Sequence, residues 1–456
     1  MKVKVKRSYV VKPSEPTWSG LLSLSELDQI GTMMYVKILY FYTTPSTLSP
    51  DAIIHSLRLS LSQVLVHFYP FAGRLSWTTA ASGGGTALAL NCNGNGAVLV
   101  EAESDAVLAD LGDFSPGPEF NHLVPSVDYS GVDPIPDIPL FAGQLTKFRC
   151  GGISLGFAIS HVVADGQGIS HFLFEWANLA SGKPLSSAPF HDRRLLRAGE
   201  SSSSSSPQGG RRIFHHSPPL IIGQSSNESE RMKETKVSTL RLSKPQIHAL
   251  KAADNNGRSC NAKLRGYTRY EVITAHIWRC ACKARSHKPQ QPTNLSFCVD
   301  IRRRMEPPLP DSYFGNAIID VVIHGVSGEI ISRPLQDVAS KIRDAIDGVT
   351  SEYVNCAIDF YRNEGDVIKR QELGTFFVGN PNLSVINWVG LPNHGLDLGW
   401  GKEIHMSPGH DCDGDVLILP DGIGGDGEGS LLVAACFQVD HIQDFNKYFY
   451  EDINNL

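Results

Sequence analysis

The sequence predicts an α/β protein built from two domains, and three observations lead to this. A chain of 456 residues exceeds what one hydrophobic core normally serves. Strand-like and helix-like patterns occur in both halves, which indicates two mixed sheets, each flanked by helices. A low-complexity, serine-rich run from Glu200 to Gly210 has the composition of a flexible linker. We therefore expect an N-terminal domain over residues 1–198, a crossover linker over 199–230 and a C-terminal domain over 231–456.

The first half contains clear examples of both patterns. Residues 1–11 alternate basic and apolar side chains with the period of a strand. Pro50 to Tyr69 carries apolar residues at helical spacing, so we expect an amphipathic helix there. The apolar run Ile153 to Ile159 has the length of a buried strand. Glycines that follow Asp165 separate this strand from a helical segment, Ile169 to Leu179.

The second half repeats this mixture. We expect helices over Lys244 to Asn255 and Glu271 to Ala284, and the segments that read as strands are Asn294–Val299, Asn316–Ile323, Val416–Leu419 and Ser430–Phe437. Glycine runs at Gly83–Gly85 and Gly422–Gly429 are typical of hairpin turns. Neither run is followed by Lys-Ser or Lys-Thr, so neither predicts a phosphate-binding loop.

Composition excludes several classes of protein. A net charge of -6 offers no broad basic surface, so we expect no nucleic-acid partner. Nine cysteines, an odd number scattered along the chain, do not form a disulfide framework and fit a reducing compartment. The first residues lack the apolar core of a signal peptide, and no apolar stretch approaches the roughly 18 residues of a membrane span. We expect a cytoplasmic monomer that binds small molecules.

One imidazole and one carboxylate stand where the apolar run ends, at His161 and Asp165. A histidine at a strand end is held rigidly yet can face a ligand, and it titrates near neutral pH. Such a residue can take a proton in one step and return it in the next, so we interpret His161 as a general base.

Three other interpretations of this stretch exist. His161 could be a core histidine and Asp165 a helix cap. His161, Asp165 and His171 could bind a metal, although no cysteine pair has zinc-finger spacing and no His-Glu-x-x-His run occurs. Ser160 could be a nucleophile, but the chain has no Gly-x-Ser-x-Gly elbow and Ser160 would point away from His161 on a strand.

A second segment, Asp397-Leu398-Gly399-Trp400-Gly401, narrows the choice. With His161–Gly166 it resembles the two signatures of the plant BAHD acyl-CoA-dependent acyltransferases, His-x-x-x-Asp-Gly and Asp-Phe-Gly-Trp-Gly. Leu398 departs from the usual phenylalanine. Further segments that look like family signposts are Tyr69–Arg74, Val299–Arg302, Tyr313–Asn316 and Phe449–Asp452. The resemblance covers the whole chain and implies two chloramphenicol-acetyltransferase-like domains with a channel between them.

The resemblance also implies roles for these residues. His161 would deprotonate the acceptor as it attacks an acyl-CoA thioester, with acyl-CoA as a co-substrate and no permanently bound cofactor or metal. Asp165 would pair with Arg302 and hold the loop that carries His161. A structural turn is expected for the glycine-rich run that contains Asp397, Gly399, Trp400 and Gly401.

Oxyanion stabilisation is expected from the indole of Trp388. Relatives that transfer hydroxycinnamoyl groups carry Thr-Ser at the two positions before this tryptophan; here Ile386 and Asn387 stand there, and the amide of Asn387 is a possible substitute near the acceptor. Basic residues should meet the phosphates of coenzyme A, unless they merely form a solvated helix face. The candidates lie around a family-like helix start and comprise Lys263, Arg265, Tyr267, Thr268, Arg269, Lys283, Arg285 and Arg303.

The acceptor is the least determined part. The opening segment, Ser8 to Ile30, looks most like the spermidine branch of the hydroxycinnamoyl transferases, so a polyamine amine is the leading acceptor. The branch that acylates shikimate or quinate normally supplies an arginine for the acceptor carboxylate, shortly before its Pro-Asn-Leu; counting back from Pro381, that position falls close to Leu373, beside Glu372, and is not an arginine here. Transfer to such an alcohol is the alternative, and a non-catalytic small-molecule-binding protein is a third. Carboxylates that could attract a polyamine are Glu26, Asp28, Asp359 and Glu372.

Overall fold

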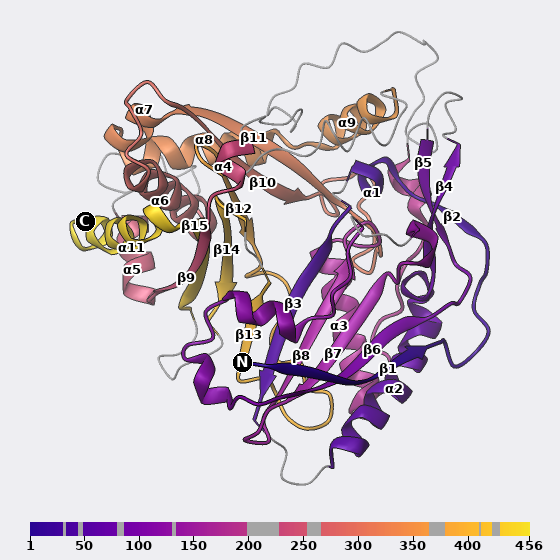
Figure 1. Ribbon diagram of the computed structural model, residues 1–456. Coiled ribbons are helices and arrows are strands. Elements are labelled where there is room, and N and C mark those ends of the chain that lie inside the picture. Colours follow the sequence, from indigo (N-terminus) through magenta and orange to yellow (C-terminus); the bar gives the residue numbers. More distant parts are fainter. Residues whose placement is uncertain are drawn as a thin grey trace, which may run out of the picture.

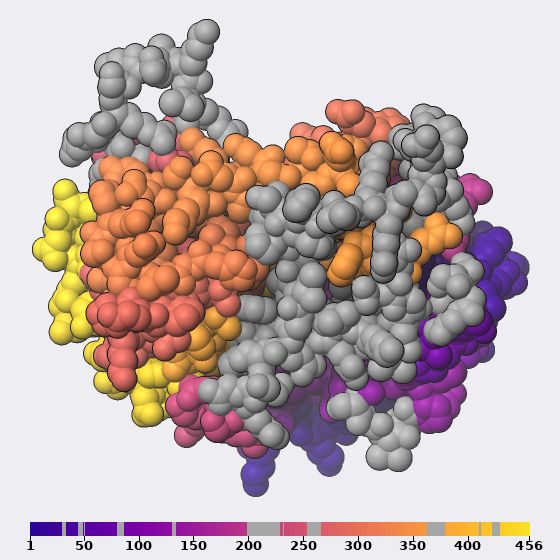
Figure 2. Space-filling model, turned by 90° about the horizontal axis from the view of Figure 1, so that it is seen from above, coloured from indigo at the N-terminus to yellow at the C-terminus, as the bar shows by residue number. Residues whose placement is uncertain are grey.

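A computed structural model describes residues 1–30, 33–43, 49–79, 86–129, 134–197, 228–252, 266–363, 379–409, 412–421 and 429–456. Its two halves lie side by side, the first in indigo to magenta and the second in salmon to yellow (Figures 1 and 2). The predicted Gly83–Gly85 turn, almost all of the linker, and Glu372 fall outside the described residues. The domain bounds predicted from the serine run therefore stay a prediction.

The first large sheet has the order β1-β6-β7-β8-β3-β13. Its strands are β1 (Val3–Val11), β6 (Ala97–Ser104), β7 (Phe141–Lys147), β8 (Ile153–Ser160), β3 (Tyr35–Tyr42) and β13 (His405–Pro408). β6 and β7 are parallel and the other pairs are antiparallel, so the sheet is mixed as expected. A smaller sheet joins β2 (Leu21–Ser23), β5 (Thr86–Asn91) and β4 (Arg74–Thr79).

The second large sheet has the order β11-β10-β12-β14-β15-β9, so β11 forms one edge. Its strands are β11 (Ile318–Val326), β10 (Pro292–Asp300), β12 (Leu383–Asn387), β14 (Asp415–Pro420), β15 (Leu431–Gln438) and β9 (Thr235–Leu242). This sheet is also mixed, because β12 runs parallel to both of its neighbours.

Helices supply the second layer of each half (Figure 1). α2 (Pro50–His67) and α3 (Gly166–Ala180) pack together and share the first core with the first sheet. In the second half, α6 (Arg269–Ala284) contacts α8 (Leu335–Gly348) and α11 (Val439–Asn454). Shorter helices are α1 (Glu26–Ile30), α4 (Glu228–Arg231), α5 (Lys244–Ala252), α7 (Ser327–Ser332) and α9 (Ser351–Asn363). Single 3₁₀ turns cover Tyr69–Ala72, Leu108–Leu111, Pro118–Leu123, Ile135–Asp137 and Arg193–Leu196.

Two predicted helices begin earlier than expected, and side-chain capping explains both. The Asp165 carboxylate accepts from the Gly168 amide at 3.0 Å, so α3 starts at Gly166. Thr268 and Glu271 form a reciprocal capping box, so α6 starts at Arg269. Among the described residues, no helix is both long and apolar enough to cross a membrane.

The second half returns to the first sheet near its end. β13 pairs antiparallel with β3, with His405 opposite Phe41, although some 360 residues separate the two strands. Trp388, Leu396 and Leu398 also belong to the first core. This segment therefore belongs to the first sheet and the first core, because its apolar side chains are buried against the first half.

Candidate active site

His161 directly follows β8, a strand in which every residue is buried. Its backbone amide donates to the Met34 carbonyl at 3.0 Å, which holds the start of the loop beside β3. The side chain is half-buried, and its buried Nδ1 finds no hydrogen-bond partner within the described part of the chain. Because Nδ1 is shielded from solvent, a bound acceptor would meet the other ring nitrogen, Nε2.

Asp165 closes the loop with four hydrogen bonds. Arg302 binds it through two parallel contacts, Nη1 to Oδ2 at 2.8 Å and Nη2 to Oδ1 at 2.9 Å. The Gly168 amide donates to Oδ1 at 3.0 Å and the Ala317 amide to Oδ2 at 2.9 Å. Burial lowers the pKa of the Arg302 guanidinium, but Asp165 and Asp300 together outweigh it, so the pKa of Arg302 is raised. The carboxylate is fully buried and has its partners, so it holds the loop in place.

A second network holds the same loop. The Asn316 side chain donates from Nδ2 to the His161 carbonyl at 2.9 Å and to Asp28 Oδ1 at 3.1 Å. Arg193 lies 2.7 Å from the Asp28 carboxylate and also donates to the Val163 carbonyl at 2.7 Å. These contacts connect α1, the His161 loop and the segment before β11, so both halves of the chain fix the histidine backbone.

The acceptor role predicted for Asp28 has no support in this arrangement, because the carboxylate is fully buried and already paired with Arg193. Of the other predicted acceptor carboxylates, Glu26 is buried in α1 and Asp359 is exposed on α9. Glu372 lies outside the described residues. The structure does not bring these side chains together around His161.

Trp388 follows β12 but packs into the first core, with 8% of its surface exposed. The residues after it rest on the start of α3. Asn393 hydrogen-bonds Ser170, and Leu391 lies so close that a Cβ on Gly166 would be 2.9 Å from it. Asn387 is exposed and its amide oxygen accepts from the Val389 amide at 3.0 Å. Trp388 thus enters the same region as the His161 loop from the second half.

The Asp397 to Gly401 run forms a tight turn. Asp397 Oδ1 accepts from the amides of Gly399 and Gly401, each at 2.9 Å, and both glycines have positive φ, +101° and +105°. Trp400 lies edge-on to Tyr42 with ring centroids 6.0 Å apart. Asp397 therefore bonds within its own turn, as the structural-turn prediction requires.

The position of this turn separates it from the chemistry. Gly399 packs beside Ala180 at the end of α3, whereas His161 precedes the start of the same helix. A helix of 15 residues is about 22 Å long, so the turn lies roughly that far from the imidazole. The turn supports the first domain and does not reach the reacting atoms.

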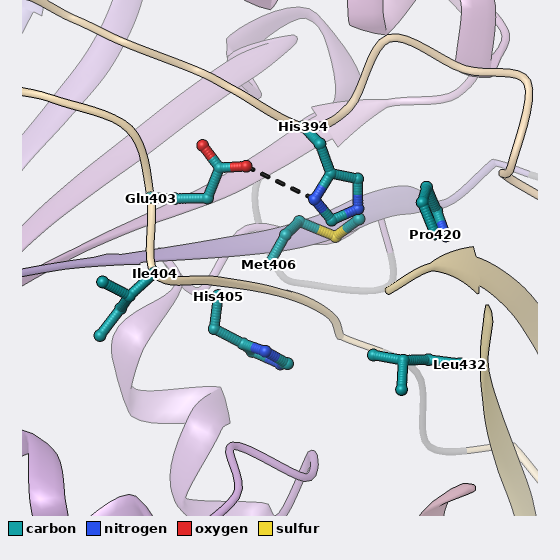
Figure 3. Close-up of a pocket in the computed structure, with 7 residues that line it drawn as sticks. All are labelled: His394, Glu403, Ile404, His405, Met406, Pro420 and Leu432. Carbon is teal, nitrogen blue, oxygen red and sulfur yellow. Dashed lines mark ion pairs between the residues drawn. The ribbon is translucent and has the colours of Figure 1, made fainter. Parts of the chain in front are cut away.

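A shallow pocket lies beside this turn (Figure 3). It encloses about 250 Å³ of space open to solvent and is lined by His394, Glu403, Ile404, His405, Met406, Pro420 and Leu432. Glu403 accepts from the amides of Gly395 and Leu396 at 2.7 and 2.8 Å and lies 3.4 Å from His394. These hydrogen bonds outweigh burial and lower the pKa of Glu403. The pocket belongs to the connection into β13, away from His161.

The residues predicted to meet coenzyme A have other contacts. Tyr267 is buried, Thr268 caps α6, and Lys283 lies 2.6 Å from Asp452. Arg303 is exposed and 3.7 Å from Asp311. Arg269 is the first residue of α6 and Arg285 is its C-cap; Arg285 is buried against Asp413. Lys263 and Arg265 lie outside the described residues. The coenzyme A contacts therefore stay a prediction.

Sequence reasoning missed Asn316, Arg193 and a third residue, Asp320 on β11. Asn316 was noted only as part of a family-like segment, and its side-chain target is 155 residues away in the chain. Asp320 carried a usable signal, because it is the one acidic residue in the otherwise apolar run from Ala317 to Ile323.

The structure thus has two mixed sheets and a half-buried histidine on a loop that contacts from both halves hold in place. The match to known proteins agrees. The model of the transferase family matches residues 1–452, so the chain belongs to this family, the BAHD acyl-CoA-dependent acyltransferases.

Curated relatives match over the full length. The chain is 41% identical to hydroxycinnamoyl-CoA:piscidic acid hydroxycinnamoyltransferase from Actaea racemosa and 36% identical to shikimate O-hydroxycinnamoyltransferase from Nicotiana tabacum. It is 33% identical to a hydroxycinnamoyl-CoA:5-hydroxyanthranilate N-hydroxycinnamoyltransferase from Avena sativa. Each match covers 99% of this chain and 100% of the relative.

The fold has a solved counterpart as well. The crystal structure of vinorine synthase superposes with a TM-score of 0.71 at 20% identity, over 97% of this chain and 96% of that one. The family and the full-length relatives make the chain an acyl-CoA-dependent acyltransferase, with acyl-CoA as co-substrate. None of the three curated relatives names a polyamine.

Proposed function

We propose that this enzyme moves a hydroxycinnamoyl group from coenzyme A to a small-molecule acceptor with His161 as the general base. The observation that carries the proposal is the half-buried imidazole with a free nitrogen on a loop held by Arg302 and Asn316. In this mechanism the acceptor binds next to His161, which takes its proton as the nucleophile attacks the thioester carbonyl.

The steps balance without a covalent enzyme intermediate. A bond forms from the acceptor nitrogen or oxygen to the carbonyl carbon, and the carbonyl oxygen becomes an oxyanion. The carbon–sulfur bond then breaks, and the imidazolium returns its proton to the coenzyme A thiolate. Holding both substrates in line can supply about 7–11 kcal/mol of the rate enhancement. We assign the indole N–H of Trp388 to the oxyanion, where one such donor contributes about 3–4 kcal/mol.

For the acceptor we propose an amine, with spermidine as the probe. Two points support it: the arginine that pairs with an acid acceptor in the resembling branch falls close to Leu373 here, where the nearest arginine is Arg370, and one relative, from Avena sativa, is N-acylating. Transfer to the hydroxyl of a carboxylic acid is the second candidate. It is favoured by the names of the relatives at 41% and 36% identity, which act on piscidic acid and shikimate.

The direct test mixes the enzyme with p-coumaroyl-CoA and either spermidine or shikimate and follows the release of free thiol. We expect release with spermidine and its loss in His161→Ala. His55→Ala, an exposed histidine on α2, is the matched control and should keep full activity. If no thiol is released with spermidine, shikimate or piscidic acid, the proposal is contradicted. Faster transfer to shikimate would replace the amine by the second candidate.

A further inference from the structure

β11 carries one acidic side chain in the middle of an apolar strand. Ala317, Ile319, Val321 and Ile323 belong to the second core, so the odd-numbered side chains face the helices of the second half. Side chains alternate along a strand, so Asp320 points to the opposite face. Its side chain is exposed, and β11 is an edge strand of the second sheet.

That opposite face is the one that meets the His161 loop. Asn316 has the same parity as Asp320, and its side chain donates to the His161 carbonyl. Ala317, between them, donates its amide to Asp165 at 2.9 Å and accepts from the Ile301 amide at 3.0 Å, so the ladder extends to this point. The start of β11 is thus fixed against the catalytic loop, and Asp320 follows it on the same face.

The groups around Asp320 come from three elements. His161 interacts with it electrostatically from the end of β8, and so does Tyr361 from α9. Cys298 of β10 lies directly opposite in the ladder. α9 also contacts α1 of the first half, which places this group at the junction of the two halves (Figure 1).

The carboxylate has no cation to pair with among the described residues. The side chain is exposed, so a ligand can reach it. An exposed carboxylate without a paired cation attracts a positively charged ligand.

We propose that Asp320 is the residue that selects the acceptor: it binds a positive charge on the acceptor while a neutral amine of the same molecule attacks beside His161. This inference rests on the proposed function and narrows its acceptor to a molecule with at least two amines. An acceptor that carries a carboxylate instead of an ammonium would be repelled at the same position.

Three acceptors of different charge test this with Asp320→Asn, which keeps the shape of the side chain and removes its charge. They are spermidine, shikimate and the neutral methyl ester of shikimate, each with p-coumaroyl-CoA. For spermidine we expect kcat/KM to fall at least about tenfold, the size of one lost charge contact, mostly through KM. Methyl shikimate should change less than about threefold, and shikimate should improve. Asp337→Asn, an exposed carboxylate on α8, is the control.

The outcomes separate the two proposals. If the unaltered enzyme releases no thiol with any of the three acceptors, the proposed function fails. If it is active but Asp320→Asn lowers all three acceptors equally, or leaves spermidine unchanged, the selection by Asp320 is overturned. Should Asp320→Asn not fold, as judged by circular dichroism, Asp320→Ser serves in its place. In the unaltered enzyme, spermidine must also compete with methyl shikimate; absence of competition would overturn the inference without any variant.

Discussion

Replacing Asp165 by asparagine tests whether this carboxylate holds the catalytic loop or takes part in the chemistry. The change keeps the shape of the side chain but removes its charge beside Arg302, with both residues almost fully buried. It also turns one oxygen into an NH₂ group that must face either Arg302 or an amide that now donates to it. A buried guanidinium is then left without its counter-ion.

The structure sets the size of the effect. Breaking a buried ion pair by removing one partner costs about 3–5 kcal/mol. For a cooperative unit of roughly 150–250 residues, each kcal/mol lowers Tm by about 2–4 °C, so we expect a fall on the order of 10 °C. Turnover should fall as well, because the loop that carries His161 loses its tie to the second half.

Asp300→Asn is the matched control. Asp300 contacts the same guanidinium at 3.1 Å, but its side chain is 47% exposed. An exposed pair contributes about 0–1 kcal/mol, so Tm should change by no more than about 3 °C. Differential scanning calorimetry and steady-state kinetics on both variants decide the question. If Asp165→Asn melts like the unaltered protein but loses turnover, the positioning role is refuted and the carboxylate belongs to the chemistry.

Further predictions concern the reacting groups and their surroundings. His161→Ala should lose at least about 100-fold in kcat with an unchanged circular dichroism spectrum, and a loss below about tenfold would exclude a general base. Trp388→Phe, which removes the indole N–H, should lower kcat by about 10²–10³-fold; an effect on KM alone would place the indole outside the oxyanion site. Turnover should survive exhaustive chelation, since in the described residues the one set of possible ligands, His276, Cys280 and Asp452, is already engaged by Phe449 and Lys283; activity lost to EDTA and restored by zinc would overturn this mechanism.

Local patterns along the chain were enough for the α/β class and for placing His161 at a strand end. The apolar run Ile153 to Ile159 lies in β8 (Ile153–Ser160), and His161 directly follows this strand. These features depend on neighbours within a few residues: the spacing of apolar side chains and the side chain that caps the next helix. The family signatures at His161 and Asp397 added the reaction type, which periodicity does not contain.

Contacts between distant segments could not be predicted in this way. Arg302 was expected to meet Asp165 only because of the family resemblance. Asp28 was expected in the acceptor site, but it is buried and hydrogen-bonded to Asn316, which is 288 residues away in the sequence. β13 joins the first sheet although it belongs to the second half of the chain. The proposed role of Asp320 depends on the face of β11 on which its side chain lies, close to His161. The energy of a buried charge depends on which partner packing brings within hydrogen-bond distance. The packing of sheets and helices decides which partner that is. From the sequence alone, a carboxylate in a buried ion pair therefore looks the same as one on the surface.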